Sequence, residues 1–468
     1  MMTIFCFVFK LIFEHFKRRR NFKRKVTKKP KKIPTPLLPT ECMEQIFNYV
    51  LQVEGAKLYP SLLVNRYWCK NVVPFLWHRP FSLVSNQNSF KLLRTFFLCF
   101  NKEENNLLNS LLKPYKIKIP SPTNNQTKLN YLIYLQELSF KDLEICVSST
   151  IHKWYGKNNN NNNNNNYNNN NNYYPDQMKI LIDSLLKFFF KNSTNLYSLN
   201  LDTYFDFLDI PDFSKYFSQS QYGLCQITKL QIIYNKPITT NTLHFLNLIS
   251  FTCNHIHTLD IKLQSYDYNA EVIHHFSNII NSQNKLVEFN ISNIMLNFEQ
   301  ILNSLQSHKN SLISIKLDCV YLTESSMILL NNLHHLKNLY LYYCEGLSNT
   351  ILEGSFVLQK LHVIYSLKLQ NITLDMLRVY GKSLQQLGLN IHDLEVAGDT
   401  AFNYCTNIDE LVLIIYNPTH LSGYDTWKKE KWKERLDQLV LSQRINLSSL
   451  SIHDHNNLDV YVNRLFYT

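Results

Sequence analysis

The chain has 468 residues, of which 45% are hydrophobic and 13% aromatic, so it is long enough for two or three domains and can bury a large core. Its formal net charge is +12, but residues 1–32 carry twelve Lys and Arg against one Glu and therefore hold +11 of that charge. The rest of the chain is almost neutral, which argues against a uniformly basic nucleic-acid-binding body, and we expect no specific nucleic-acid partner.

Residues 1–32 join an apolar stretch to a basic one. The apolar run has about a dozen residues, whereas a bilayer span needs roughly 20. A secretory signal would carry its positive charge before the apolar run, not after it. Three interpretations remain open: a disordered basic tail, a weak membrane-surface anchor that combines an apolar wedge with a polybasic patch, and a nuclear-import or nucleic-acid patch.

Ten cysteines are spread through the chain, and none belongs to a Cys-x-x-Cys pair. This distribution favours reduced thiols in the cytosol or nucleus over zinc ribbons and redox motifs. The sequence also lacks a phosphate-binding loop, a dinucleotide fingerprint and the motifs of metalloproteases and serine hydrolases. We therefore expect a non-catalytic protein with no cofactor and no metal, located in the cytoplasm or nucleus, with a peripheral membrane location as the alternative.

Residues 33–83 form a short segment that is dense in large apolar side chains and bounded by prolines. Apolar residues at helical spacing predict three short helices, over residues 41–51, about 58–64 and 66–76. Thr40 is expected to cap the first helix, and Pro74 is expected to end or kink the third.

The order of apolar landmarks in this segment resembles an F-box, a motif that opens with Leu-Pro, continues with an Ile/Phe helix and ends on Val-x-x-x-Trp and Leu-Trp. The matching residues are Leu38, Pro39, Ile46, Phe47, Val50, Leu63, Val64, Trp68, Leu76 and Trp77. In that family the unit binds the Skp adaptor of cullin–RING ubiquitin ligases. The resemblance therefore implies that these residues contact the adaptor or fill the small core beneath the contact.

Residues 84–157 are expected to link this unit to a series of repeats and to contain the first, irregular copy, Leu135-x-x-Leu138-x-Phe140. Within this region, residues 90–119 predict a helix followed by a strand. Residues 158–172 are nine Asn, a Tyr and five Asn. Such a tract buries nothing, so we expect a disordered surface insertion.

A six-residue pattern, Leu-x-x-Leu-x-Leu with Ile, Val or Phe variants, recurs ten times between residues 196 and 452. Each copy predicts a short strand, and the segments between copies have helical spacing. One strand and one helix cannot hide their own apolar face, so the copies must stack. The pattern resembles leucine-rich repeats, which implies an α/β solenoid over residues 173–468, a horseshoe with parallel strands and outer helices.

Three cysteines make this resemblance more specific. Cys253, Cys344 and Cys405 lie at offsets from the repeats that are similar to those of the cysteine-containing subtype, which often accompanies an F-box. In this interpretation the thiols are buried small hydrophobic groups and not ligands. Residues 427–443 predict an additional charged helix in the wide gap before the last copy.

Together the two resemblances predict the substrate-recognition subunit of an SCF-type (Skp–cullin–F-box) ubiquitin ligase, which would hold a target protein for ubiquitination and proteasomal degradation. Strand positions that alternate with the buried leucines are expected to face solvent on the concave side and bind the target. The selected residues are Asp260, Lys262, Lys316, Asp318, Tyr340, Tyr342 and Asn390. The two tyrosines are the best anchor candidates, because aromatic residues often dominate interfaces. The alternative is a leucine-rich-repeat scaffold that residues 1–32 tether to a membrane, with the helical unit serving only as a solenoid cap.

Overall fold

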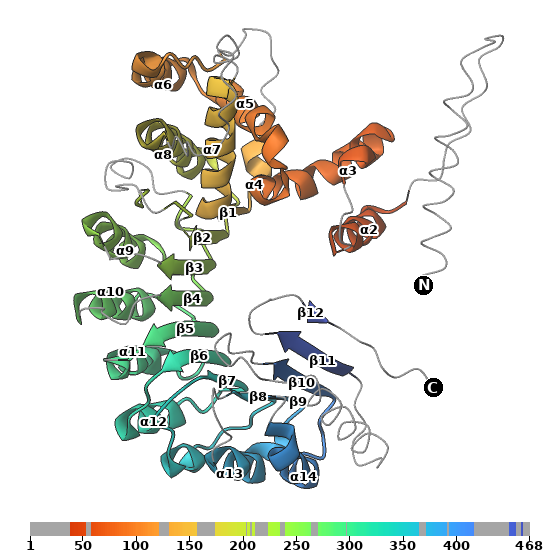
Figure 1. The fold of residues 1–468 in the computed structure, drawn as a ribbon, viewed down its shortest axis with the longest axis vertical. Helices are drawn as coiled ribbons and strands as arrows, with labels where there is room; N and C mark the ends of the chain where they lie inside the picture. The colour runs from red at the N-terminus through yellow and green to blue at the C-terminus, as the bar shows by residue number, and fades with distance from the viewer. Residues whose placement is uncertain are drawn as a thin grey trace, which may run out of the picture. The chain divides into compact units, whose positions relative to one another are not determined.

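The computed structural model describes residues 38–52, 58–120, 131–156, 174–202, 204–205, 208–210, 223–234, 239–263, 270–295, 297–364, 371–390, 393–415, 449–454 and 460–461 (Figure 1). The expectations for residues 1–32, for the Asn-rich tract and for a helix over residues 427–443 lie outside these ranges. The chain divides into two compact units, residues 1–71 and residues 72–468. The boundary falls within the segment that resembles an F-box.

The described helices of the first unit follow the predicted order. They are α2 (Thr40–Gln52), the 3-10 turn η1 (Tyr59–Leu63) and the start of α3 (Arg66–Trp77). Thr40 is the first residue of α2 and not its cap, because the Pro39 carbonyl accepts the first helical hydrogen bond, from the Met43 N–H at 3.1 Å. Pro74 does not end α3, which continues to Trp77.

The second unit begins with a helical region that precedes the repeats. Its longer elements are α4 (Pro80–Leu83), α5 (Ser89–Cys99), α6 (Lys102–Leu112), α7 (Phe140–Gly156) and α8 (Pro175–Asn192), and short 3-10 turns lie at Asn86–Asn88, Lys113–Tyr115 and Tyr131–Tyr134. Phenylalanines join these helices, with ring centroids 5.0 Å apart for Phe96 and Phe189 and 4.5 Å apart for Phe100 and Phe188. The resulting core is continuous with the core of the repeats.

Residues 90–119 form two helices, so the prediction of a helix followed by a strand is wrong. Asn101 separates α5 from α6 and caps α6, because its side-chain oxygen accepts a hydrogen bond from the Glu104 N–H at 2.8 Å. The Glu104 carboxylate in turn accepts one from the Asn101 N–H at 3.0 Å. This reciprocal capping box starts a second helix, and no strand follows it within residues 90–119.

The predicted α/β solenoid is confirmed. Twelve strands of the described residues form one sheet in which the spatial order equals the sequence order, and all neighbours from β1 to β11 are parallel. The strands are β1 (Glu137–Ser139), β2 (Ser198–Asp202), β3 (Lys229–Tyr234), β4 (Thr258–Leu263), β5 (Glu288–Ile294), β6 (Ser314–Val320), β7 (Asn338–Tyr342), β8 (Lys360–Ile364), β9 (Gln386–Asn390), β10 (Glu410–Ile415), β11 (Ser449–Asp454) and β12 (Val460–Tyr461). The last strand pairs antiparallel with β11.

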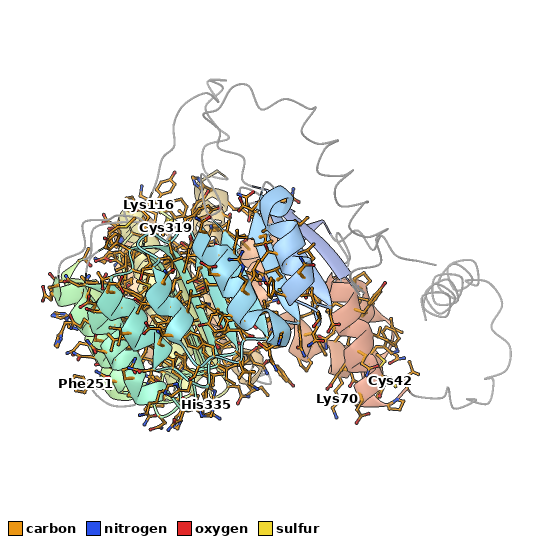
Figure 2. All side chains as sticks on the ribbon, turned by 90° about the horizontal axis from the view of Figure 1, so that it is seen from below. Cys42, Lys70, Lys116, Phe251, Cys319 and His335 are labelled. Atoms are coloured by element: carbon orange, nitrogen blue, oxygen red, sulfur yellow. The ribbon has the colours of Figure 1, made fainter. Side chains whose placement is uncertain are left out.

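Helices connect the strands on one side of the sheet (Figure 1). They are α9 (Thr240–Thr252), α10 (Ala270–Asn281), α11 (Phe298–Leu305), α12 (Glu324–Asn331), α13 (Asn371–Tyr380) and α14 (Leu394–Tyr404), with 3-10 turns at Gln306–His308, Asn349–Glu353 and Gly381–Ser383. Between helices and sheet, repeat residues such as Leu259, Leu317 and Leu341 are at most 1% exposed. Burying each such side chain contributes about 1.5–3 kcal/mol. By contrast, Phe251 on α9 is 81% exposed (Figure 2).

The three cysteines that sharpened the repeat pattern are buried, as predicted. Cys253 is 0% exposed, and Cys344 and Cys405 are each 2% exposed. Burial raises the pKa of the Cys253 and Cys405 thiols to about 12, so both remain protonated at neutral pH. They are therefore poor nucleophiles and poor metal ligands.

Each repeat begins by directing two consecutive backbone N–H groups at one carbonyl of the preceding repeat. For example, the Thr228 and Lys229 N–H groups donate to the Tyr197 carbonyl at 2.9 and 3.0 Å, and the same arrangement recurs down to the Gln385 carbonyl. This ladder of paired hydrogen bonds starts before β1, because the Gln136 and Glu137 N–H groups donate to the His78 carbonyl at 3.0 and 2.9 Å. The segment after α3 thus takes the place of a preceding repeat.

Three residues without a glycine's freedom adopt left-handed backbone conformations at equivalent repeat positions. Asn293, Cys319 and Tyr343 have φ values of 64°, 53° and 52°, and they follow residues that are paired in register across β5, β6 and β7. Asparagine tolerates this conformation best among them. The Asn293 side-chain amide also donates to the Leu263 carbonyl of the preceding repeat.

We expect Asn293→Ala to lower the free energy of unfolding by about 1–2 kcal/mol. The substitution removes a hydrogen bond to a neighbouring repeat, and alanine tolerates left-handed backbone less well than asparagine does. Chemical denaturation of the full chain measures the change. Asn293→Gly serves as the control, since it removes the same bond but accepts the backbone conformation. An alanine variant as stable as the wild type would contradict this prediction.

We expect the stability of the chain to depend on pH through Glu137, which lies where the ladder of paired hydrogen bonds starts. The His78 imidazole, 3.6 Å from the Glu137 carboxylate, and the Tyr197 hydroxyl, 2.9 Å from it, hold the pKa of Glu137 at about 2 against the opposing effect of burial. The folded-state pKa of Glu137 lies below the usual 4.5, so the ionised carboxylate stabilises the folded chain. This stabilisation is fully present above about pH 4.5 and is lost as the pH falls toward 2. Glu137→Gln should therefore be less stable than wild type at pH 6 by roughly 1 kcal/mol or less, since the site is partly exposed. Denaturation midpoints of the wild type and the variant at pH 6 and pH 3 test this prediction. The difference between the two midpoints should be smaller at pH 3 than at pH 6, and an equal difference at both pH values would refute it.

Candidate target-binding surface

The ten residues of the F-box resemblance range from buried through half-buried to exposed. Phe47 is 1% exposed and packs edge-on against Trp68, with ring centroids 5.7 Å apart, and Val50 is 9% exposed. Leu38 and Leu63 are 43% and 71% exposed. Pro39 is also exposed, whereas Ile46, Val64, Trp68, Leu76 and Trp77 are half-buried.

The final pair of that set, Leu76 and Trp77, belongs to the second unit. Trp77 stacks on Tyr131 with ring centroids 4.1 Å apart and meets Phe96 edge-on at 5.4 Å. Its side chain is therefore part of the core of the helical region. A structural role accounts for this tryptophan without any partner protein.

The strand register places all seven residues selected for target binding on two parallel rows of the sheet. The first inner row is Gln231, Asp260, Asn290, Lys316, Tyr340, His362, Gly388 and Val412. The second inner row is Ile233, Lys262, Ser292, Asp318, Tyr342 and Ile364, and it continues with the paired Asn390 and Ile414. These rows lie on the sheet face opposite the helices, because their residues alternate with the buried repeat positions.

The charged residues on β4 are paired with one another. The Asp260 carboxylate lies 3.7 Å from the Lys262 ammonium and accepts a hydrogen bond from the Gln231 amide at 2.7 Å. The charge of Lys262 is thus largely balanced within this face.

Lys316 on β6 is placed differently. Its ammonium lies over the ring of Tyr342, 4.6 Å from the centroid. Burial lowers the pKa of Lys316, an effect that the neighbouring Asp318 only partly offsets. A half-buried cation on an aromatic face gains attraction from the ring quadrupole, and the Lys316 ammonium makes no ion pair with a carboxylate of the described residues.

His362 and Gly388 hold the two tyrosines and were not found from the sequence. The Tyr342 hydroxyl is hydrogen-bonded to His362 Nδ1 at 2.9 Å, and the Tyr340 ring meets the His362 ring edge-on at 4.7 Å. A Cβ added at Gly388 would lie 2.3 Å from the imidazole, so only glycine leaves room for it. Burial raises the pKa of both tyrosines, which keeps them as neutral hydrogen-bonding groups.

Asn390 does not face solvent, which corrects the expectation from strand alternation. It is only 5% exposed. The reason is that the rows turn apolar towards β10, where Ile364, Val412 and Ile414 are 1%, 4% and 9% exposed and form a small cluster with Tyr342 and Tyr343. The accessible part of the surface therefore lies over β4 to β7.

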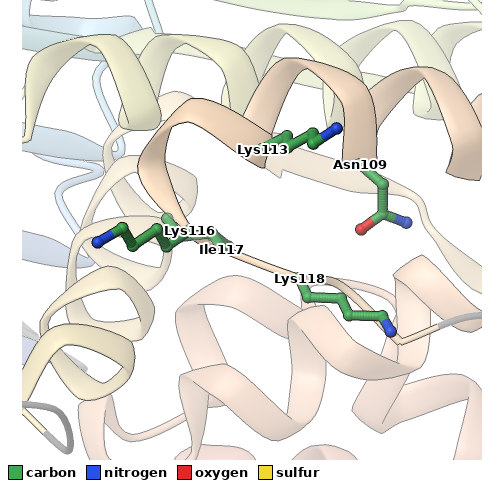
Figure 3. Close-up of a pocket in the computed structure, with 5 residues that line it drawn as sticks. All are labelled: Asn109, Lys113, Lys116, Ile117 and Lys118. Atoms are coloured by element: carbon green, nitrogen blue, oxygen red, sulfur yellow. The ribbon is translucent and has the colours of Figure 1, made fainter.

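A separate hollow of about 420 Å³ lies where α6 ends, lined by Asn109, Lys113, Lys116, Ile117 and Lys118 (Figure 3). Its three lysines are exposed and come from one turn and the segment that follows it. The hollow offers positive charge on an open surface and lies outside the inner rows. Over the described ranges, no group of three or more His, Cys, Asp or Glu side chains could hold a metal ion, and no helix is long and apolar enough to cross a membrane.

Comparison with known proteins identifies no family for this chain. No family model matches the sequence, and no curated protein matches it. Among solved structures, the chain is similar to an internalin, inlF, from Listeria monocytogenes str. 4b F2365, with 15% sequence identity over 51% of this chain and 76% of that one, at a TM-score of 0.27. The conclusions about binding therefore depend on the surface itself. A stacked-repeat solenoid with an extended sheet face is suited to binding another protein.

Proposed function

We propose that this chain is the substrate-recognition subunit of an SCF-type ubiquitin ligase. The observation that carries the proposal is the separation of the F-box-like residues into a small core and an exposed apolar set, which precedes a protein-binding solenoid. Phe47 and Val50 fill the core, while Leu38, Pro39 and Leu63 remain at the surface. Exposed apolar residues on so small a unit favour a protein partner, here the Skp adaptor and, through it, a cullin–RING ligase.

In this proposal the chain performs no chemistry. The inner rows would hold a target protein while other subunits position the ubiquitin-charged enzyme. The contribution of the chain would be to raise the effective concentration of target lysines near that enzyme. This role requires two surfaces, one for the adaptor and one for the target.

A binding assay with purified Skp adaptor and the full chain tests the first surface. We expect Leu38→Asp combined with Leu63→Asp to abolish binding, because a charge replaces apolar contact at two exposed positions. Phe251→Asp is the matched control, since Phe251 is 81% exposed but lies on α9 of the second unit. Absence of binding by the wild-type chain would refute the proposal.

A non-catalytic repeat scaffold is the second candidate, favoured by the packing of Trp77 in the core of the helical region. In that case the residues after Asn71 would cap the solenoid, and residues 1–32 would attach the chain to a membrane surface. Deleting residues 1–32 should then move the chain from the membrane fraction to the soluble fraction of fractionated cells. An unchanged distribution would refute the tether.

A further inference from the structure

We propose that Lys316 is the anchor of the target-binding surface and that it binds the carboxylate of an acidic side chain in a target protein. This inference rests on the proposed target-binding function of the inner rows. It assigns a specific chemistry to one position on them.

The anchor is built by a chain of contacts across four strands. Gly388 on β9 leaves room for the His362 ring on β8, which is hydrogen-bonded to the Tyr342 hydroxyl on β7 at 2.9 Å. The Tyr342 ring in turn lies beneath the Lys316 ammonium on β6, at 4.6 Å. Each contact fixes the next, so the ammonium is positioned before any partner arrives, which lowers the entropy cost of binding.

Lys316 retains its capacity to donate. Among the residues that the structure describes, no carboxylate lies within the 4.0 Å of an ion pair with its ammonium, whereas Lys262 on the same face is paired with Asp260 at 3.7 Å. Its row neighbours Asn290 and Tyr340 make no hydrogen bond through their side chains to other described residues. The ammonium, the amide and the hydroxyl therefore belong to adjacent positions of one half-buried row and can donate together to an anionic oxygen.

The surrounding charge favours a carboxylate over a phosphate. Asp318 lies two residues from Lys316 on the same face of β6, in register with Tyr342. One ammonium balances the single charge of a carboxylate. A phosphate carries about −1.5 to −2 at neutral pH and would leave excess negative charge beside Asp318.

Selecting a random peptide library on the full-length chain, then measuring affinities by fluorescence anisotropy, tests the inference. We expect selected peptides to share an Asp or Glu whose replacement by Asn or Gln weakens binding roughly tenfold or more, as for a charge-assisted hydrogen bond. Lys316→Met should remove this difference between the acidic and amide peptides. Lys262→Met is the matched control and should preserve it.

Two positioning variants separate the anchor from general stability. Gly388→Ala should displace the His362 ring. Tyr342→Phe should remove the hydrogen bond between residue 342 and His362 without adding an atom. Both should weaken the acidic peptide more than its amide version, whereas a purely structural defect would weaken both equally.

Three results would overturn the inference: selected peptides without a shared acid, equal effects of the Lys316 and Lys262 variants, or tighter binding when phosphoserine replaces the acid. Adaptor binding gives an independent readout. If the Lys316 variant still binds the adaptor, failure of the peptide prediction leaves the proposed function intact.

Discussion

Gly346→Ala is expected to lower the free energy of unfolding by about 3 kcal/mol, the combined cost of a left-handed backbone and a clash with a neighbouring carbonyl oxygen. Gly346 has a φ of 79°, and an added Cβ would lie 2.1 Å from the Leu322 carbonyl oxygen. That carbonyl cannot retreat easily, because the Leu322 N–H donates to the Glu345 carbonyl at 2.9 Å and the Glu345 N–H donates to the Val320 carbonyl at 3.0 Å. The backbone therefore has no cheap way to accommodate a side chain.

Denaturant unfolding of the full chain measures the loss. Gly354→Ala is the matched control: its φ is not left-handed, and an added Cβ would meet the side chains of Phe356 and Asn331 and not backbone. The control should lose less stability, because it lacks the cost of the left-handed backbone. Equal losses for the two glycine variants would contradict the argument.

Gln283→Ala is expected to cost about 2–4 kcal/mol, because it leaves several buried backbone groups without partners. The Gln283 side chain accepts a hydrogen bond from the Ile256 N–H at 2.8 Å and donates to the Cys253 and Ile279 carbonyls at 2.8 and 2.7 Å. It is 6% exposed, so water cannot replace those bonds. The residue thus joins two successive repeats through their backbones.

Thermal and chemical unfolding of Gln283→Ala measure this effect, with Asn284→Ala as the control on the adjacent exposed residue, expected to change stability by no more than about 0.5 kcal/mol. His308 makes equivalent contacts to backbone groups one repeat later. Its Nε2 lies 2.8 Å from the Ile280 carbonyl, and the Leu286 N–H faces its Nδ1 at 3.5 Å. His308→Ala should therefore be similarly harmful. A tolerated Gln283→Ala would contradict the prediction that these side-chain-to-backbone bonds contribute to stability.

The repeat architecture could be predicted from the sequence because each copy carries its own signal. Alternate apolar residues such as Leu259 and Ile261 mark a strand whose inner side is buried, and copies that cannot bury that side alone must stack. Strand order and parallel pairing follow from stacking. Nothing beyond the local pattern was needed.

Gln283 and His308 could not be predicted in the same way. Their role depends on which carbonyl and which N–H of the neighbouring repeat come within reach, and this is decided by the three-dimensional register. A Gln and a His at similar places in successive repeats share no sequence pattern. The same holds for His362, whose position depends on the missing side chain at Gly388 one strand away.

The target-binding surface was predicted only in part. The rule that residues between buried leucines face solvent places Lys316 and Tyr340 on the inner rows, as the register shows. It fails for Asn390, because burial of that face depends on apolar residues of neighbouring strands such as Val412 and Ile414. Alternation identifies a face, but it does not reveal whether that face is covered.

The start of the ladder at His78 has a practical consequence for dissecting the protein. A recombinant fragment that began at residue 84, after the predicted F-box, would lose the carbonyl that receives the Gln136 and Glu137 N–H groups. Its first strand would then be a bare edge, able to recruit another chain and precipitate. Cutting instead at the compact-unit boundary, before Val72, keeps that carbonyl and the Trp77 packing within the same piece.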